Sequence, residues 1–97
     1  MGEYEEKKKE VSEKYNDYRE AFYTPVLEHG DEKLAYKNRM MQQKIESVAK
    51  ALREMQAVAP ASEQAKIADA VAKTENEARE FRERVDYYER KLNREKR

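Results

Sequence analysis

Residues 34–59 read LAYKNRMMQQKIESVAKALREMQAVA and carry an unbroken helical repeat. Apolar residues recur at alternating intervals of four and three residues, and Asn38 is the single polar exception. Such spacing is typical of one face of an α-helix. Tyr36 and Met40 add a second apolar row, so the apolar stripe is wide enough to contact more than one neighbour. We therefore expect this helix to be the central element of the fold. The members of the repeat are Leu34, Asn38, Met41, Ile45, Val48, Leu52, Met55 and Ala59.

Two breaks bound this central segment, Pro25 with Gly30 before it and Pro60 after it. Gly30 suits a left-handed residue that ends one helix, and Asp31 suits the N-cap of the next. Ser62 suits the N-cap of the last helix. The sequence thus predicts a single helical domain over residues 1–97, with helices over about 3–23, 32–58 and 63–95.

The two outer segments keep a helical period of their own. The segment 3–23 has an aromatic stripe, and the segment 63–95 continues an apolar seam of heptad type. Short connections make neighbouring helices antiparallel, so we predict an all-α fold, an antiparallel three-helix coiled-coil bundle. It combines a long hairpin of the second and third helices with a shorter, aromatic-rich first helix. We expect these aromatic residues to converge at one end: Tyr15, Tyr18, Phe22, Tyr36, Phe81, Tyr87 and Tyr88.

Composition narrows the class of protein. The 97 residues include 21 Lys and Arg, 21 Asp and Glu, one His and no Cys. Without cysteine there is no disulfide, no thiolate nucleophile and no cysteine-based metal site. No apolar run approaches the roughly 18 residues that span a membrane, and the N-terminus has no signal-peptide pattern. We expect a cytoplasmic protein with no membrane partner and no cofactor.

A metal site or an active site has little support in the sequence. His29 lies among Glu28, Asp31 and Glu32, which are competent ligands. However, the chain has no second histidine to build a paired motif, and Gly30 and Asp31 already fit the roles of helix end and helix start. No carboxylate has an apolar setting that would raise its pKa, and no glycine-rich loop is present. We therefore expect that the chain is not an enzyme.

Charges flanking the last seam permit self-association. In a parallel pair of these helices, Glu77 would face Arg82 and Arg84 would face Glu89. The alternative is that the charges pair within one helix at a spacing of four, as in Glu80 and Arg84. A small bundle with few large aliphatic residues is marginally stable, so we expect a homo-oligomer, with a dimer favoured. The predicted self-association residues are Val71, Ala78, Phe81, Val85, Tyr88 and Leu92.

These features predict a non-enzymatic protein–protein interaction module that acts as an adaptor, an inhibitor or an assembly subunit. Its aromatic residues at the edge of the seams are surplus to core packing, and tyrosine is enriched at interfaces. The alternative is a small nucleic-acid-associated regulator that uses the basic end of the last helix, because non-specific binding depends on phosphate contacts. The predicted partner-binding residues are Tyr4, Tyr23, Tyr36, Tyr87, Arg90, Lys91 and Arg94.

Overall fold

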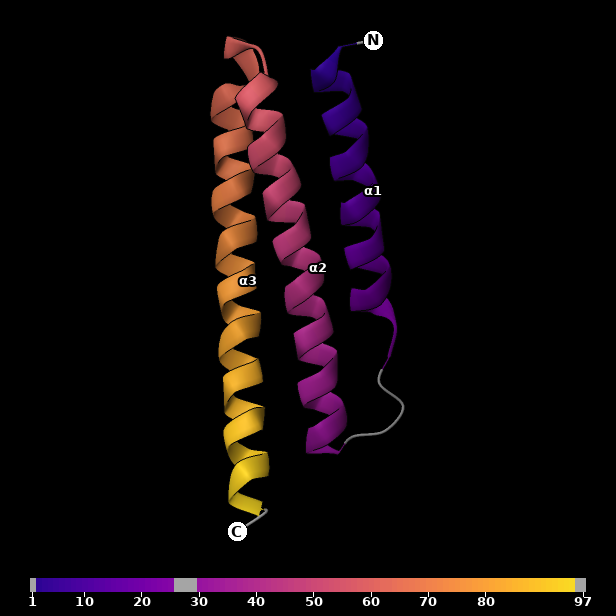
Figure 1. Cartoon of the computed structure of the whole chain (residues 1–97), viewed down its shortest axis with the longest axis vertical. Coiled ribbons are helices and arrows are strands. Elements are labelled where there is room, and N and C mark those ends of the chain that lie inside the picture. Colours follow the sequence, from indigo (N-terminus) through magenta and orange to yellow (C-terminus); the bar gives the residue numbers. More distant parts are fainter. Residues whose placement is uncertain (1, 26–29, 96–97) are drawn as a thin grey trace.

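The computed structural model describes residues 2–25 and 30–95. These residues form α1 (Glu3–Tyr23), α2 (Asp31–Val58) and α3 (Ala61–Glu95). The helices make a rod of 55 × 21 × 15 Å. Figure 1 shows α2 between α1 and α3, with each helix antiparallel to the next. The predicted all-α, antiparallel three-helix bundle is confirmed, and the described residues contain no strand.

The core follows the repeat on α2. Ile45 and Val48 are 0% and 1% exposed, and they belong to one core cluster with residues of α3 and with Tyr18 of α1. Burying one such aliphatic side chain contributes about 1.5–3 kcal/mol before the entropy of ordering it is subtracted. The prediction that α2 is the central helix is confirmed, because α2 carries most of the buried residues. The core cluster consists of Tyr18, Met41, Ile45, Val48, Leu52, Met55, Ile67, Ala78 and Phe81.

The helix starts differ from the sequence prediction. Gly30 has an extended backbone, with φ −75° and ψ 151°, and it is the N-cap of α2 rather than a left-handed helix end. Its carbonyl accepts a hydrogen bond of 3.0 Å from the Leu34 amide, so Asp31 becomes the first helical residue. Ser62 lies inside the first turn of α3 instead of capping it, because the Pro60 carbonyl already accepts the Glu63 amide at 3.0 Å. Residues 28 and 29, which the sequence disfavours as metal ligands, lie outside the described residues.

Side chains from neighbouring helices stabilise two helix C-termini. The last turns of α1 and α2 contain no basic residue that could offset the helix dipole. Lys37 of α2 donates to the carbonyl of Thr24 at 2.9 Å, at the end of α1. Gln64 of α3 donates to the carbonyls of Gln56 at 2.8 Å and Ala59 at 2.9 Å, at the end of α2. Each helix end is thus tied to the next helix in the bundle.

Three ion pairs between α2 and α3 follow the register of the long hairpin. Residue numbers on α2 rise by seven as those on α3 fall by seven, as expected for antiparallel helices with a heptad repeat. The sequence permits pairing of these charges within α3 or between two parallel copies, and within the chain the structure instead pairs three of them with α2. The positions on α3 are the seam flanks that face α2, so an intramolecular partner was within reach. The pairs are Arg39–Glu89, Glu46–Arg82 and Arg53–Glu75.

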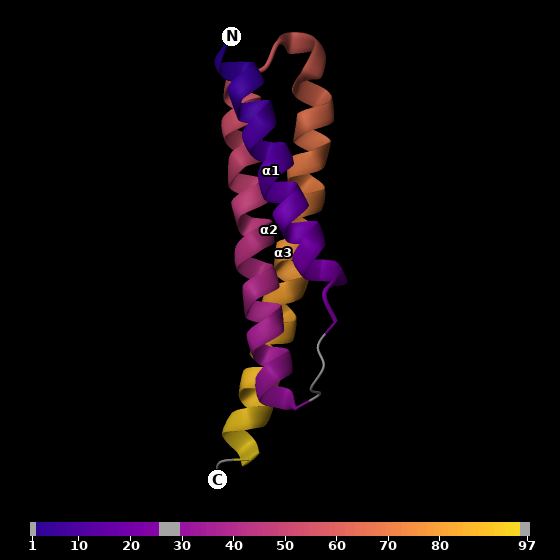
Figure 2. The same cartoon turned by 90° about the vertical axis from the view of Figure 1, so that its right-hand side faces the viewer.

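The bundle is open between its two outer helices. Among the described residues, no Cα atom of α1 lies within 8 Å of a Cα atom of α3, whereas both helices approach α2 that closely. Figure 2 shows α1 lying over the α2–α3 hairpin and ending well before the C-terminal end of α3. A groove between α1 and α3 and an uncovered end of α3 follow from this arrangement.

Candidate interaction surface

A row of aromatic rings lines the groove between α1 and α3. Tyr18 is buried at 7% exposure, and its ring lies 6.3 Å from that of Phe81 in an edge-on arrangement. Tyr15 and Phe22 flank it at 6.2 and 6.1 Å, and Tyr23 lies 5.2 Å beyond Phe22. Of the four rings on α1, only Tyr18 is covered, since Tyr15, Phe22 and Tyr23 are 44%, 53% and 71% exposed. The row therefore begins in the core and continues onto the surface.

The groove itself holds about 400 Å³ and is lined by the two outer helices. From α1 it takes the aromatic row and Arg19, and from α3 it takes Phe81 with charged residues on either side. Helices packed directly against each other have axes about 8–10 Å apart. The outer helices do not pack in this way, so apolar rings remain open to solvent along the groove. The charged residues contributed by α3 are Glu77, Glu80 and Arg84.

Two charged residues at the groove, Glu77 and Arg84, contact aromatic side chains. The Tyr18 hydroxyl donates a hydrogen bond of 3.2 Å to Glu77 Oε2, which joins α1 to α3. Burial and, next, the nearby charge of Glu77 raise the pKa of Tyr18, so its hydroxyl stays protonated at neutral pH. Arg84 lies 5.0 Å from the centre of the Phe81 ring, within range of a cation–π contact. The groove thus presents apolar surface between positive and negative charges.

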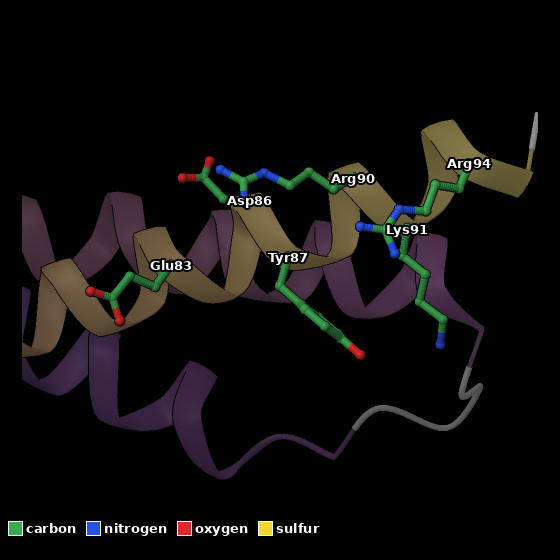
Figure 3. Close-up of a pocket in the computed structure, with 6 residues that line it drawn as sticks. All are labelled: Glu83, Asp86, Tyr87, Arg90, Lys91 and Arg94. Atoms are coloured by element: carbon green, nitrogen blue, oxygen red, sulfur yellow. The ribbon is translucent and has the colours of Figure 1, made fainter.

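The uncovered end of α3 carries a mixed set of charges. Figure 3 shows Tyr87 and Lys91 pointing to the side of α3 on which α1 lies, whereas Asp86 and Arg90 point away from it. Lys91 Nζ lies 3.3 Å from a carboxylate oxygen of Asp31 on α2. The hydrogen bond and charge of Asp31 raise the pKa of Lys91. The basic end that was predicted to contact nucleic acid is therefore partly neutralised within the chain.

The predicted partner-binding tyrosines fall into different environments. Tyr23, Tyr36 and Tyr87 are 71%, 65% and 60% exposed. Tyr4 is instead partly buried, because it packs against the core and the Lys8 ammonium lies 5.6 Å from its ring centre. Of these tyrosines, Tyr23 lines the groove, Tyr87 lies on the uncovered end of α3, and Tyr36 lines neither. Arg90 and Arg94 are exposed on α3.

The residues predicted for self-association are used mainly inside the chain. Ala78, Phe81 and Val85 are 3%, 6% and 7% exposed and belong to the buried surface of α3. Val71 packs partly buried against the core, and Tyr88 and Leu92 are also partly buried. A contact with a second copy through Ala78, Phe81 and Val85 would need these buried side chains to leave the core, and self-association stays a prediction.

Sequence reasoning missed Phe22, Tyr15 and Arg19 as surface residues. The aromatic stripe was interpreted as core because its spacing fits a heptad seam, and spacing does not reveal how much of a stripe a neighbour covers. A signal was present, since Tyr15, Tyr18, Phe22 and Tyr23 are too many large rings over nine residues for one narrow seam. The expected convergence of aromatic residues is observed around Tyr18, Phe22 and Phe81, while Tyr87 and Tyr88 form a separate pair with ring centres 5.2 Å apart.

Two further findings concern the described ranges alone. Residues 2–25 and 30–95 contain no group of three or more His, Cys, Asp or Glu side chains placed to hold a metal ion. Within the same ranges, none of the helices combines the length and the apolar character needed to cross a bilayer.

Comparison of the chain with protein-family models, with curated proteins and with solved structures gives no match. The fold places the chain in the class of antiparallel three-helix bundles. The surface of the bundle is the basis for the function proposed below.

Proposed function

We propose that the chain is a non-enzymatic protein–protein interaction module that seats a helix of its partner in the groove between α1 and α3. It would act by occupying a surface, as an adaptor, an inhibitor or an assembly subunit. The partner helix would become a further member of the bundle and lie against the aromatic row of α1 and the charged edge of α3.

The observation that carries this proposal is the exposure of Phe22 and Tyr23 beside a core ring. Both are more than half exposed, at 53% and 71%, although they continue the row that Tyr18 begins. Aromatic side chains bury about 150–250 Å² each and dominate the energetics of interfaces. They stand on a regular helix, so little conformational entropy is lost when a partner covers them.

The charges of the groove favour a protein partner over a polyanion. Glu77 and Glu80 lie beside Arg19 and Arg84 along the same groove. A nucleic acid would need a surface of one sign, because its affinity depends on the number of phosphates neutralised. A helix that carries both signs of charge on either side of an apolar stripe could complement such a groove, as in coiled coils.

The alternative function, a small nucleic-acid-associated regulator, rests on Arg90 and Arg94. Both are exposed near the C-terminal end of α3. The charge available there is reduced by Asp86 beside Arg90 and by the ion pair of Lys91 with Asp31. This function would bring a steep loss of affinity with salt, and loss of binding when residues 90–97 are removed.

The test is site-specific photo-crosslinking of the full chain in the cells that make it. A photoreactive amino acid replaces Phe22 in the groove, and in the matched control it replaces Gln43, an exposed residue of α2 that does not line the groove. We expect a discrete protein adduct from position 22 and none from position 43. A Tyr23→Ser change in the same chain should weaken the adduct, because it removes the neighbouring ring.

Three results would contradict the proposal. Equal labelling at positions 22 and 43 would mean that the groove has no preferred partner. The absence of any adduct at position 22 would mean the same. Adducts with nucleic acid from a probe at Arg90, without protein adducts from position 22, would support the alternative function instead.

A further inference from the structure

One exposed stripe of α3 is acidic at one end and basic at the other. Two antiparallel copies of this stripe would therefore place opposite charges against each other. The stripe follows spacings of three and four, so its members share one face of the helix. It begins with two acidic residues, passes through Arg84 and Tyr87, and ends with two basic residues. All but Glu77 are exposed, and Glu77 is half-buried. The stripe consists of Glu77, Glu80, Arg84, Tyr87, Lys91 and Arg94.

We propose that this stripe is the contact between two copies of the chain, with the two α3 helices antiparallel about a twofold axis between Arg84 and Tyr87. In that register Glu77 faces Arg94 of the second copy, and Glu80 faces Lys91. Arg84 faces Tyr87 at the centre, where a guanidinium can stack on the ring. Because the interface is twofold, each of these contacts occurs twice.

Parallel pairing of the same stripe would be unfavourable. It would bring Glu77 and Glu80 against the same acidic residues of the second copy, and Lys91 and Arg94 against the same basic residues. Like charges across a helix interface destabilise it. The charge order of the stripe therefore selects the antiparallel arrangement.

The charges on the neighbouring stripe of α3 disfavour a dimer in which the two helices are rotated about their axes to pair through that stripe. Its members are also exposed and also follow spacings of three and four. An antiparallel pair centred on this neighbouring stripe would set Arg79 against Arg90 and Glu83 against Asp86 of the second copy, and both contacts are repulsive. Figure 3 shows that Asp86 and Arg90 point away from the side on which Tyr87 and Lys91 lie. Self-complementarity is thus a property of one face.

The open side of the bundle gives this contact room. Tyr18 lies level with Glu77 and Phe81, and α1 ends five residues later at Tyr23. The last part of the stripe, from Tyr87 onward, is therefore not covered by α1. In the antiparallel arrangement, the end of α3 from the second copy enters the groove beside Phe22 and brings Lys91 and Arg94 to its acidic residues. This inference rests on the proposed function, because it names the partner of the same groove.

The experiment measures the association of the full chain by analytical ultracentrifugation over a range of concentrations at low salt. We expect the wild type to dimerise and Glu80→Lys to dissociate at a concentration at least about tenfold higher, because two attractive pairs become repulsive. Lys91→Glu should also weaken the dimer, because the same two pairs become repulsive, and it removes the ion pair of Lys91 with Asp31 inside the chain as well. Asp86→Lys is the matched control, because Asp86 is exposed and points away from the side on which Tyr87 and Lys91 lie, and its dimer should be unchanged.

Mixing the two variants gives a sharper result. Glu80→Lys and Lys91→Glu each repel themselves, yet a mixed pair would place Lys against Glu at both sites. We expect the equimolar mixture to associate as tightly as the wild type, and a chain with both changes to dimerise again. Far-UV circular dichroism of each variant checks that helicity is retained.

A distance measurement tests the direction of pairing. The chain has no cysteine, so Lys73→Cys introduces one labelling site on an exposed position of α3. Spin labels at this site should lie about 40 Å apart along an antiparallel pair, from a rise of about 1.5 Å per residue, and about 10 Å apart in a parallel pair. The short distance would overturn the proposed arrangement.

The failure of this inference is distinguishable from the failure of the proposed function. A wild type that stays monomeric, or a mixture that does not associate, overturns self-association. If position 22 then crosslinks a different protein, the groove still binds a partner and only its identity as a second copy is wrong. If position 22 gives no protein adduct either, both proposals fail.

Discussion

The Tyr18 hydroxyl of α1 lies 3.2 Å from Glu77 Oε2 of α3 and donates a hydrogen bond to it. This contact joins two helices whose backbones do not approach each other. The ring of Tyr18 belongs to the core, while its hydroxyl reaches the charged edge of the groove. A tyrosine suits this position because one end of the side chain is apolar and the other polar.

Replacement of Tyr18 by Phe should lower the free energy of unfolding by about 1 kcal/mol at pH 7, because the hydrogen bond to Glu77 is lost. Urea unfolding followed by circular dichroism measures this change. Phe22→Tyr, which adds a hydroxyl to an exposed ring of the same row, is the matched control and should change stability by less than about 0.5 kcal/mol. Equal stability of Tyr18→Phe and wild type would mean that the hydrogen bond contributes nothing.

The same residue predicts a loss of stability at alkaline pH. The pKa of Tyr18 in the folded chain is raised above its ordinary value of 10.0, chiefly by burial. The unfolded chain therefore releases this proton first, and stability falls as pH rises above 10.0 by up to about 1.4 kcal/mol per pH unit. Tyr18→Phe should show a shallower decline between pH 9 and 11 in urea unfolding. Parallel declines would contradict the assignment.

The pair of Glu46 and Arg82 should couple α2 to α3. Glu46 Oε1 lies 3.1 Å from the Arg82 guanidinium, and both side chains are about half exposed. We expect Glu46→Arg and Arg82→Glu each to destabilise the chain, and the double variant to recover about 0.2–1 kcal/mol of coupling energy. A double-mutant cycle in urea measures this energy. A coupling energy of zero would mean that the pair does not help to fix the register.

The acid side of the pH profile should depend on the same carboxylate. Hydrogen bonds from Gln42 and then Arg82 lower the pKa of Glu46 below its ordinary value of 4.5. Its stabilising contribution is present above pH 4.5 and is lost as pH falls through the lower, folded-state pKa. Glu46→Gln should reduce the loss of stability between pH 5 and 3, measured by urea unfolding.

Gln64 should stabilise the end of α2 more than its place on α3 suggests. Its amide donates to two carbonyls at the end of α2, that of Ala59 and that of Gln56, which also accepts a backbone hydrogen bond of 3.3 Å from the Ala59 amide. Gln64→Ala should therefore cost about 1 kcal/mol and speed hydrogen exchange in the turn around Pro60. Gln43→Ala, at an exposed site on α2, should cost less than about 0.5 kcal/mol. Equal effects of the two changes would show that the capping contact is not stabilising.

The helices themselves could be predicted because their signals are local. The repeat around Ile45 and Leu52, the breaks at Pro25 and Pro60, and the short connections determine three helices and their antiparallel order. The first predicted helix matches α1, and the starts of α2 and α3 differ by one and two residues. The starts differ because backbone carbonyls at Gly30 and Pro60 accept the first helical hydrogen bonds.

The open groove could not be predicted from spacing. A heptad pattern tells which face of a helix is apolar, and it says nothing about how far a neighbour extends along that face. The pattern therefore predicted the same burial for Phe22 and Tyr18, although Phe22 is 53% exposed and Tyr18 is 7% exposed. Likewise it could not decide whether Arg82 pairs within α3, with a second copy or with Glu46, because several acidic residues lie at suitable spacings.

The sequence by itself determined the three helices, their antiparallel order and the buried stripe of α2. Each follows from local signals, namely the spacing of apolar residues within a segment and the breaks between segments. Only the tertiary structure decided that α1 does not cover the C-terminal end of α3 and that charges flanking the seam of α3 pair with α2. It also decided that aromatic rings remain on the surface. These outcomes depend on the lateral spacing and relative lengths of packed helices, which are set by contacts between residues far apart in the sequence.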